Sequence, residues 1–80
     1  MRIVKKYGYI DIRDGFIKRF IIHKKYRGKG YARQLSKFIP KHARLFPCRL
    51  FFNEGLSNQQ LMVFYSSIGF VLQKDGTMVR

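Results

Sequence analysis

The sequence is poor in the residues that form disulfides, bind zinc or carry negative charge. Its 80 residues include one cysteine, two histidines and no tryptophan, and only four are acidic. One cysteine cannot form a disulfide within the chain, and with two histidines it leaves too few ligands for a zinc site built on cysteine pairs. We therefore expect Cys48 to pack in the core and expect no metal.

The sequence also lacks a long apolar segment. Its apolar runs, such as residues 20–22 and 70–72, fall far below the roughly 18 residues that a membrane span needs. Residues 1–6 alternate apolar and basic side chains, and the apolar stretch of a secretory signal does not follow them. We therefore expect an intracellular, cytoplasmic chain.

What the sequence has in abundance is positive charge and apolar side chains. Lys and Arg number 17, the formal net charge is +13, and 46% of the residues are hydrophobic. This apolar content is too high for a disordered basic tail, and the length allows one thin core, so we expect a single domain over residues 1–80. The charge is typical of proteins that bind nucleic acid, an anionic membrane or a phosphate-rich cofactor, although Lys and Arg also simply solvate surfaces.

The pattern of residues 7–23 predicts a β-hairpin. Asp14-Gly15 separates two apolar-rich runs, and both turn residues tolerate positive φ. The expected cross-strand pairs are Arg13 with Phe16, Ile12 with Ile17, Asp11 with Lys18, and Tyr9 with Phe20. The expected faces are Tyr7, Tyr9, Phe16, Phe20 and Ile22 on one side, and Gly8, Ile10, Ile12, Ile17 and Ile21 on the other. Both faces would need a cover.

The rest of the chain predicts two helices, one strand and a second hairpin. Apolar residues recur at helical spacing over residues 31–46, and Pro40 predicts a kink or an early end within residues 36–40. Residues 48–53 form a short strand, and Ser57 with Gln60 predicts a capping box that opens a helix over residues 57–68. Gly69 ends that helix, and residues 70–73 and 77–79 form a hairpin. The predicted order is ββαβαββ.

The segment Arg27-Gly28-Lys29-Gly30-Tyr31-Ala32 lies between the predicted second strand and first helix. Glycines at such a turn let consecutive main-chain N–H groups converge on an anion at the positive end of a helix dipole. The surrounding cations, which suit a ligand with several phosphates, are Lys24, Lys25, Arg27, Lys29 and Arg33. A plain strand-to-helix turn with glycine for steric reasons remains the alternative.

Two separated motifs resemble those of the GNAT superfamily of acetyl-CoA-dependent N-acetyltransferases. They are the loop of residues 27–32, and Asn58 followed by Tyr65-Ser66-Ser67-Ile68-Gly69-Phe70. The resemblance covers about residues 8–80. It implies an α/β (α+β) fold, a mixed sheet flanked by two helices, and an enzyme that transfers an acetyl group from acetyl-CoA to a primary amine.

The resemblance also implies roles for single residues. The residues it places at the cofactor are Ile21, Ile22, His23, Arg27, Gly28, Lys29, Gly30, Tyr31, Ala32, Arg33, Asn58 and Tyr65. Main-chain amides of the loop would hold the CoA pyrophosphate, and the strand ending near His23 would run beside the pantetheine arm. Asn58 would contact the CoA side of the cleft, and Tyr65 would protonate the departing thiolate, although Tyr65 also continues the apolar stripe of its helix.

The chain departs from the family at its beginning. Members usually begin with a strand and two helices that form much of the acceptor pocket, whereas about seven residues precede the matching region here. The resemblance therefore leaves an apolar hairpin face uncovered. That face consists of Ile10, Ile12, Ile17 and Ile21. We expect a homodimer or a bound partner to cover it.

The group that accepts the amine proton is less well defined. Asp14 and Asp75 belong to predicted turns and Asp11 is paired, so Glu54 is the acidic candidate, although a solvated loop carboxylate is an equally good interpretation of it. His23 has a suitable intrinsic pKa, although a histidine at a strand end is commonly a surface residue. His42 is expected on the buried edge of the first helix.

Three functions remain open at this stage. The first is a minimal N-acetyltransferase whose acceptor is unknown and could be anionic, such as RNA or a ribonucleoprotein. The second is a CoA-binding module without catalysis, and the third is a basic nucleic-acid-binding domain. The third explains the charge but not the paired motifs, and no base-stacking aromatic platform can be distinguished from core in the sequence. None of the three requires a membrane partner.

Overall fold

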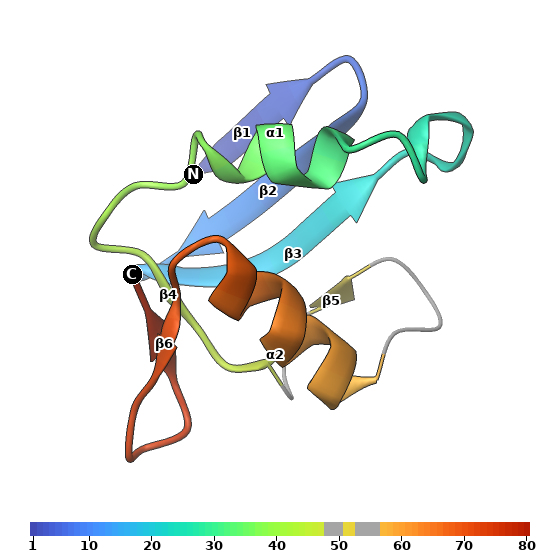
Figure 1. Ribbon diagram of the computed structural model, residues 1–80. Helices are drawn as coiled ribbons and strands as arrows, with labels where there is room; N and C mark the ends of the chain where they lie inside the picture. The colour runs from blue at the N-terminus through green and yellow to red at the C-terminus, as the bar shows by residue number, and fades with distance from the viewer. Residues whose placement is uncertain (48–50, 53–56) are drawn as a thin grey trace.

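A computed structural model describes residues 1–47, 51–52 and 57–80 of the chain. The described strands are β1 (Arg2–Lys5), β2 (Gly8–Arg13), β3 (Phe16–Ile22), β4 (Arg44–Leu45), β5 (Phe51–Phe52), β6 (Val71–Leu72) and β7 (Met78–Val79), and the described helices are the 3₁₀ turn η1 (Lys24–Tyr26), α1 (Tyr31–Ser36) and α2 (Asn58–Ser67). The strands form one mixed sheet in the order β1-β2-β3-β4-β7-β6, with β5 also beside β3. Both α-helices lie in front of this sheet in Figure 1. The α+β class expected from the sequence is confirmed.

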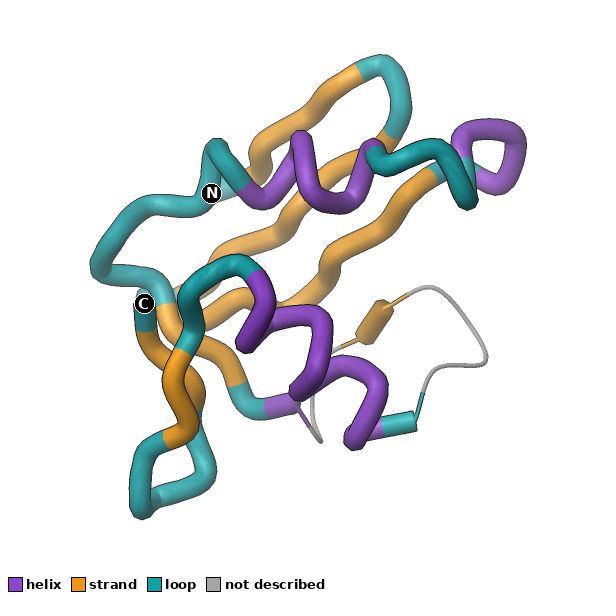
Figure 2. The backbone as a smooth tube through the Cα atoms, in the orientation of Figure 1, coloured by secondary structure: helices purple, strands orange, loops and turns teal. Residues whose placement is uncertain are grey.

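Strand β3 is the centre of the sheet. It pairs antiparallel with β2, which pairs antiparallel with β1. Its other edge pairs in parallel with β4 near the start of β3 and with β5 at Arg19 and Phe20. Figure 2 shows β3 with these neighbouring strands along its two edges. The hairpin of β6 and β7 extends the sheet beyond them. The segment that the sequence indicates for cofactor binding follows β3 along the chain. The segment that it indicates for proton donation contacts β3.

The first hairpin is confirmed, but half of its expected register is wrong. Asp14 and Gly15 form the turn with φ of 54° and 80°. The pairs nearest the turn are as expected, whereas Asp11 pairs with Arg19 instead of Lys18, and Tyr9 pairs with Ile21 instead of Phe20. The reason is a β-bulge, which leaves Lys18 as an extra residue on β3 and shifts every later pair by one position.

The bulge also changes which side chains share a face. The buried residues of β2 and β3 include Ile10, Ile12, Ile17, Phe20 and Ile22, each at most 5% exposed. They form a single core with residues of both helices, including Leu35 of α1 and Leu61 and Tyr65 of α2. The expectation that Ile10, Ile12 and Ile17 lie on an uncovered face is therefore wrong, because α1 and α2 cover that face.

Two short strands and the end of the first helix differ from the sequence-based expectation. β1 and β4 were not predicted, because neither strand is long enough to show a clear alternation. α1 ends at Ser36, which agrees with an early end before Pro40, and i to i−3 hydrogen bonds tighten its last turn at Lys37, Phe38 and Ile39. His42 is exposed in the following loop, so its expected place on a buried helix edge is wrong.

The second helix and hairpin follow the sequence closely. Ser57 caps α2 by accepting a hydrogen bond from the Gln60 amide, and the Gln60 side chain accepts one from the Ser57 amide. Gly69 adopts φ of 101° after the helix, as expected for a left-handed terminating residue. The predicted hairpin at the end of the chain is confirmed as β6 and β7 around Asp75-Gly76.

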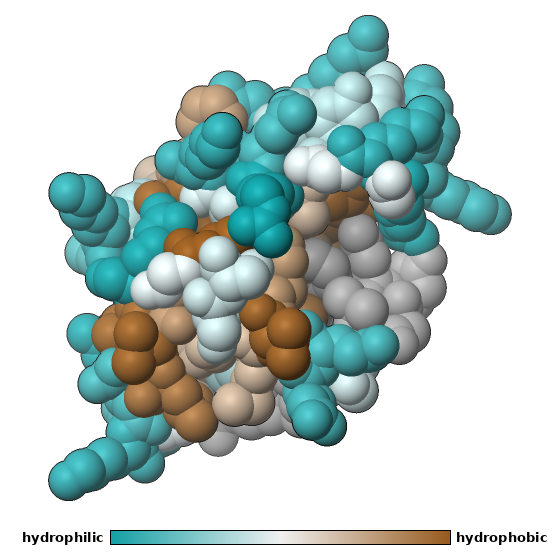
Figure 3. Space-filling model, in the orientation of Figure 1, coloured by the Kyte–Doolittle hydropathy of each residue, from teal (hydrophilic) through white to brown (hydrophobic). Residues whose placement is uncertain are grey.

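The expected central strand falls partly on residues that the structure describes. β5 covers Phe51–Phe52 of the strand expected over residues 48–53, and the remaining four positions, Cys48 among them, lie outside the described residues. Across the residues that are described, no helix has the length and apolar character to cross a membrane. Figure 3 shows apolar surface on the helix side, and the exposed apolar side chains include Val63, Val71 and Leu72.

Candidate functional site

The glycine-containing loop connects the end of β3 to the start of α1. The Arg27 Nε donates a hydrogen bond to the main-chain oxygen of Ile22 at 3.0 Å, which ties the loop to the end of the strand. Tyr31 stacks on Tyr7 with ring centroids 4.5 Å apart and meets Tyr26 edge to face at 5.4 Å. The loop is therefore anchored at both ends by side-chain contacts, while its central residues face outward.

Both central glycines use conformations that other residues adopt at a cost. Gly28 and Gly30 have φ of 76° and 83°, in the left-handed region that favours glycine. No atom lies within 4 Å of the place that a Cβ would occupy at either position. The surface over both glycines is therefore open, and a ligand can approach the main chain directly.

The same loop carries a run of unpaired main-chain donors. Within the described part of the chain, no acceptor takes a hydrogen bond from the N–H groups of residues 28–33. Gly30 is the N-cap of α1 and provides no side chain to satisfy them. Successive outward N–H groups around left-handed residues form a concave site that binds anions. The loop therefore has donors available for an anion, and the phosphate cradle itself stays a prediction.

Cations surround this loop. Lys24, Lys25 and Lys29 are exposed, and the Arg33 Nη2 donates to the Ser67 Oγ of α2 at 3.3 Å. The helix α1 has only six residues, so its dipole is weaker than that of the longer helix expected from the sequence. An anion at this loop would therefore be attracted mainly by the N–H groups and by these side chains rather than by the helix.

Tyr65 lies in the core, on the helix-covered side of the sheet. It is 0% exposed and meets Phe20, Phe64 and Phe70 edge to face, with ring centroids 5.2 to 6.1 Å apart. Burial raises the pKa of its hydroxyl well above the usual value, so the group keeps its proton at any physiological pH. Among the described residues, its Oη has no hydrogen-bond partner.

The other predicted site residues divide between the two faces of the sheet. Ile22 is buried on the helix-covered face, the same face as Tyr65. Ile21 is half-buried on the opposite face, and the exposed His23 ring lies 6.3 Å from Tyr9. Strand alternation therefore separates residues that the resemblance groups along one pantetheine arm.

Two further predicted residues cannot be placed in this site. Asn58 is the first residue of α2, and its side chain lies outside what the structure describes. Glu54 lies outside the described residues. Their roles, as contact to CoA and as acceptor of the amine proton, therefore stay predictions.

The structure also shows supporting residues that the sequence did not indicate. Tyr7 stacks on the first residue of α1, and Ser67 of α2 accepts from Arg33, 34 positions away in the chain. Tyr7 was expected only as a strand residue, and Ser67 only as part of a motif. A contact across such a distance in the chain has no periodic signal in a single sequence.

The site therefore consists of a loop with open glycines and available N–H donors, and of a buried phenol on the helix-covered face. A family model described as acetyltransferase (GNAT) domain matches residues 2–72, which is all but the first residue and the last eight. Neither a curated protein nor a solved structure matches the chain. Because this match covers most of the chain, the chain belongs to the GNAT acetyltransferase family.

Proposed function

We propose that this chain is an N-acetyltransferase that uses acetyl-CoA and acetylates a primary amine of its acceptor. The observation that carries the proposal is the open run of donor N–H groups at residues 28–33 in a chain of the GNAT family. Acetyl-CoA is the ligand that fits this loop best, because its pyrophosphate supplies several acceptor oxygens with negative charge.

The loop residues would hold the cofactor through the main chain. Space is open over Gly28 and Gly30, and the N–H groups of residues 28–33, which have no acceptor among the described residues, would donate to phosphate oxygens. Lys29 and Arg33 add charge-assisted contacts at the edge of the loop. Glycine is needed at position 30 because a side chain there would both strain the backbone and separate the phosphates from the donors.

Tyr65 would serve as the proton donor at its Oη. Acetyl-CoA, when bound, supplies the acetyl group as an activated thioester. The Tyr65 hydroxyl is neutral and buried, and leaving such a group without a partner costs about 1–3 kcal/mol. A hydrogen bond donated from Oη to the departing sulfur would remove this cost and stabilise negative charge there.

The positions of the described carboxylates narrow the choice of a group that accepts the amine proton. Asp11 is hydrogen-bonded to Arg2, Asp75 is bonded to Thr77, and Asp14 lies in a turn. None of these three carboxylates contacts Tyr65 or the loop in the described residues. We retain Glu54 and His23 as the two proposed bases, with water as the remaining acceptor.

A second candidate function is a CoA-binding module without catalysis. The observation that favours it is the arrangement of the described carboxylates: Asp11 and Asp75 are bonded to other residues, and Asp14 lies in the turn between β2 and β3. Such a module would use the same loop and would bind acetyl-CoA without turnover. Catalytic measurements therefore have to be separated from binding measurements.

Calorimetric titration with acetyl-CoA tests the binding step. We expect micromolar affinity that falls with salt, and loss of binding in Gly30→Val. Gly76→Val is the matched control, because Gly76 also has positive φ, at 89°, and also has no atom within 4 Å of the place of a Cβ, but lies in the distant hairpin turn. Circular dichroism checks folding, and Gly30→Ala replaces the valine variant if that variant does not fold.

Release of free CoA tests the chemistry, with small amines, polyamines and RNA-linked amines as acceptors. Tyr65→Phe keeps the aromatic packing and is expected to lower turnover about 10²-fold with unchanged acetyl-CoA affinity. Tyr9→Phe removes a hydroxyl on the other face and should leave turnover unchanged. No binding at millimolar acetyl-CoA would refute the proposal, whereas tight binding without turnover on any acceptor would favour the CoA-binding module.

A further inference from the structure

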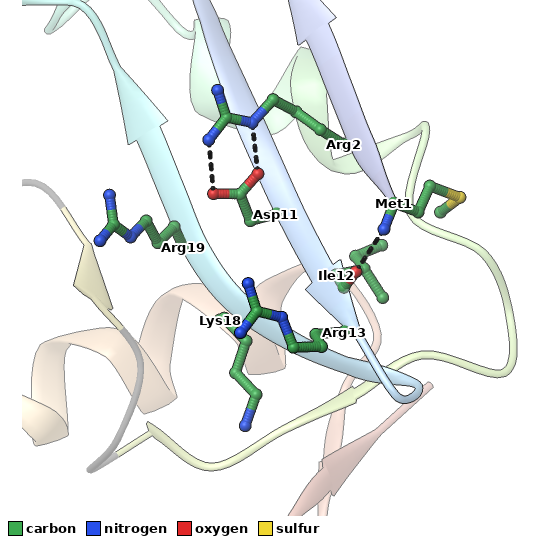
Figure 4. A pocket seen from close by; sticks show the side chains of 7 residues that line it. All are labelled: Met1, Arg2, Asp11, Ile12, Arg13, Lys18 and Arg19. Carbon is green, nitrogen blue, oxygen red and sulfur yellow. Dashed lines mark hydrogen bonds and ion pairs between the residues drawn. The ribbon is translucent and has the colours of Figure 1, made fainter.

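The sheet has a second face that the helices do not cover. We call it the open face and define it by two rows of side chains across β1, β2 and β3. The first row is Arg2, Asp11 and Arg19, and the second is Val4, Tyr9 and Ile21. Figure 4 looks onto the first row with both helices behind the sheet. The open face is therefore opposite to Tyr65 and to the buried core.

A basic cleft of about 730 Å³ occupies one end of the open face. Its charged lining residues are Arg2, Asp11, Arg13, Lys18 and Arg19. Asp11 is the acid of this set, and the Arg2 guanidinium donates to both of its carboxylate oxygens, at 2.5 and 3.1 Å. Arg13 and Lys18 make no ion pair within the described part of the chain. The cleft therefore has an excess of positive charge over its one carboxylate.

The β-bulge explains why the charge is concentrated there. In a regular strand, Lys18 and Arg19 would point to opposite faces of the sheet. The extra residue in β3 breaks this alternation, and both side chains are exposed while Ile17 and Phe20 on either side of them are buried. The bulge thus places two consecutive cations on this face, with Lys18 beside Arg13 and Arg19 farther along β3, opposite Asp11, as Figure 4 shows.

The second row adds a flat apolar surface beside the cations. Val4 is 64% exposed, and Tyr9 and Ile21 are half-buried next to it. The Arg2 guanidinium carbon lies 4.6 Å from the centre of the Tyr9 ring, and the centre of the His23 ring lies 6.3 Å from it. The Arg2 guanidinium thus lies over the half-buried Tyr9 ring, and the guanidinium and the ring together are suited to stack with a planar base.

We propose that the open face binds a single-stranded nucleic acid. Arg13 and Lys18 contact the phosphates, and a base stacks against Tyr9 and the Arg2 guanidinium over it, which combines the two kinds of contact that single strands use. A second copy of this chain would bring like charges together, because each carries a net charge of +13. A duplex keeps its bases stacked inside and cannot use Tyr9. This surface is separate from the glycine loop and does not depend on acetyl transfer.

Fluorescence anisotropy with a labelled ten-nucleotide oligouridylate tests the charge contribution. The variant Arg13→Glu/Lys18→Glu is compared with Lys41→Glu/Lys74→Glu, which changes the net charge equally at exposed sites away from the open face. We expect affinity to fall on the order of tenfold or more in the first variant, with a smaller salt dependence, and little change in the second. Equal losses in both variants would overturn the proposal, because the binding would then follow net charge alone.

The stacking contribution is tested with Tyr9→Leu, which keeps an apolar side chain and all charges. Loss of one base stack predicts binding weaker by about tenfold for the single strand, and no change for a duplex of the same length. Circular dichroism and acetyl-CoA binding confirm that the variant is folded. Unchanged single-strand affinity in Tyr9→Leu, or preferential binding to vesicles of anionic lipid over the oligonucleotide, would refute a nucleic-acid surface here.

Discussion

The two faces of one three-stranded segment carry opposite kinds of side chain. The face under the helices presents four isoleucines and one phenylalanine, each of which is at most 5% exposed. The open face presents arginine, aspartate, tyrosine and an exposed valine from the same strands. The difference shows that the strands of this small domain serve stability on one side and are available for recognition on the other.

The distinction between the faces depends on one extra residue. Without the bulge at Lys18, simple alternation from the turn would place Phe20 and Ile22 with Tyr9, and Ile21 with Ile10. Both faces would then be partly apolar and partly polar. With the bulge, Ile17, Phe20 and Ile22 of β3 are buried on the same face as the isoleucines of β2. Phe16 and Ile21 are the two large apolar residues of β3 that are not buried. The bulge therefore separates the core from the basic cleft.

The largest expected effect comes from truncating a residue of the covered face. Phe20→Ala should lower the free energy of unfolding by about 3–5 kcal/mol, because it removes a fully buried ring that contacts Phe64 and Tyr65. Val4→Ala on the open face should change it by less than about 0.5 kcal/mol. Urea denaturation measures both, and similar values for the two variants would contradict the distinction between the faces.

A smaller effect of opposite sign is expected at Tyr65. Because its buried hydroxyl lacks a partner in the described residues, Tyr65→Phe should raise the free energy of unfolding by about 1 kcal/mol in the absence of ligand. Tyr9→Phe on the open face should leave stability unchanged. Thermal denaturation compares them, and a destabilised Tyr65→Phe would mean that the hydroxyl is already satisfied in the free protein.

The helix that covers the C-terminal part of the sheet depends on its cap. Ser57→Ala removes the hydrogen bond from the Gln60 amide at 3.2 Å and should cost about 1 kcal/mol. Ser66→Ala, an exposed position later in the same helix, is the control and should have almost no effect. Equal effects in chemical denaturation would indicate that the capping box does not hold the start of α2.

The smallest effect is expected on the open face itself. Hydrogen bonding to Arg2 holds the pKa of Asp11 below its usual value of 3.8. The stabilisation from this lowered pKa is therefore fully present when the pH is above the pKa of Asp11 in the unfolded chain. It is lost as the pH falls through the lower pKa of Asp11 in the folded protein. Asp11→Asn should lower the denaturation midpoint slightly at neutral pH. In strong acid, below the pKa of Asp11 in the folded protein, the variant and the wild type should have the same midpoint. If the midpoints still differ in strong acid, the effect of the substitution comes from packing and not from the charge of Asp11.

The sequence predicted those parts of the fold in which one local pattern specifies the backbone. Asp14-Gly15 set the first turn, Ser57 with Gln60 set the start of α2, and Gly69 set its end. Pro40 correctly limited the first helix, although residues 41–46, which also matched a helical spacing, form a loop and β4. A helical period in six residues cannot be distinguished from a loop whose apolar side chains happen to reach the core.

The sequence predicted some features of the candidate site and missed others. The glycines at 28 and 30 are in the positive-φ conformations that the loop motif requires, and Tyr65 is buried on the face that the stripe of α2 predicted. The expectation that Ile21, Ile22 and His23 act as one group did not anticipate that they lie on both faces. The hydrogen bond from Arg33 to Ser67 could not be predicted from the sequence either, because it joins residues 34 positions apart.

By itself the sequence determined the class of fold, the family and the positive-φ glycines of the loop at residues 27–32, since these depend on turn residues, caps and motifs that act within a few positions. The tertiary structure alone decided which face of the hairpin is covered and where the excess positive charge gathers. The physical reason is that a single bulged residue reverses the alternation of a strand, and its position depends on packing of Phe20 and Ile22 against two helices rather than on the strand's own pattern.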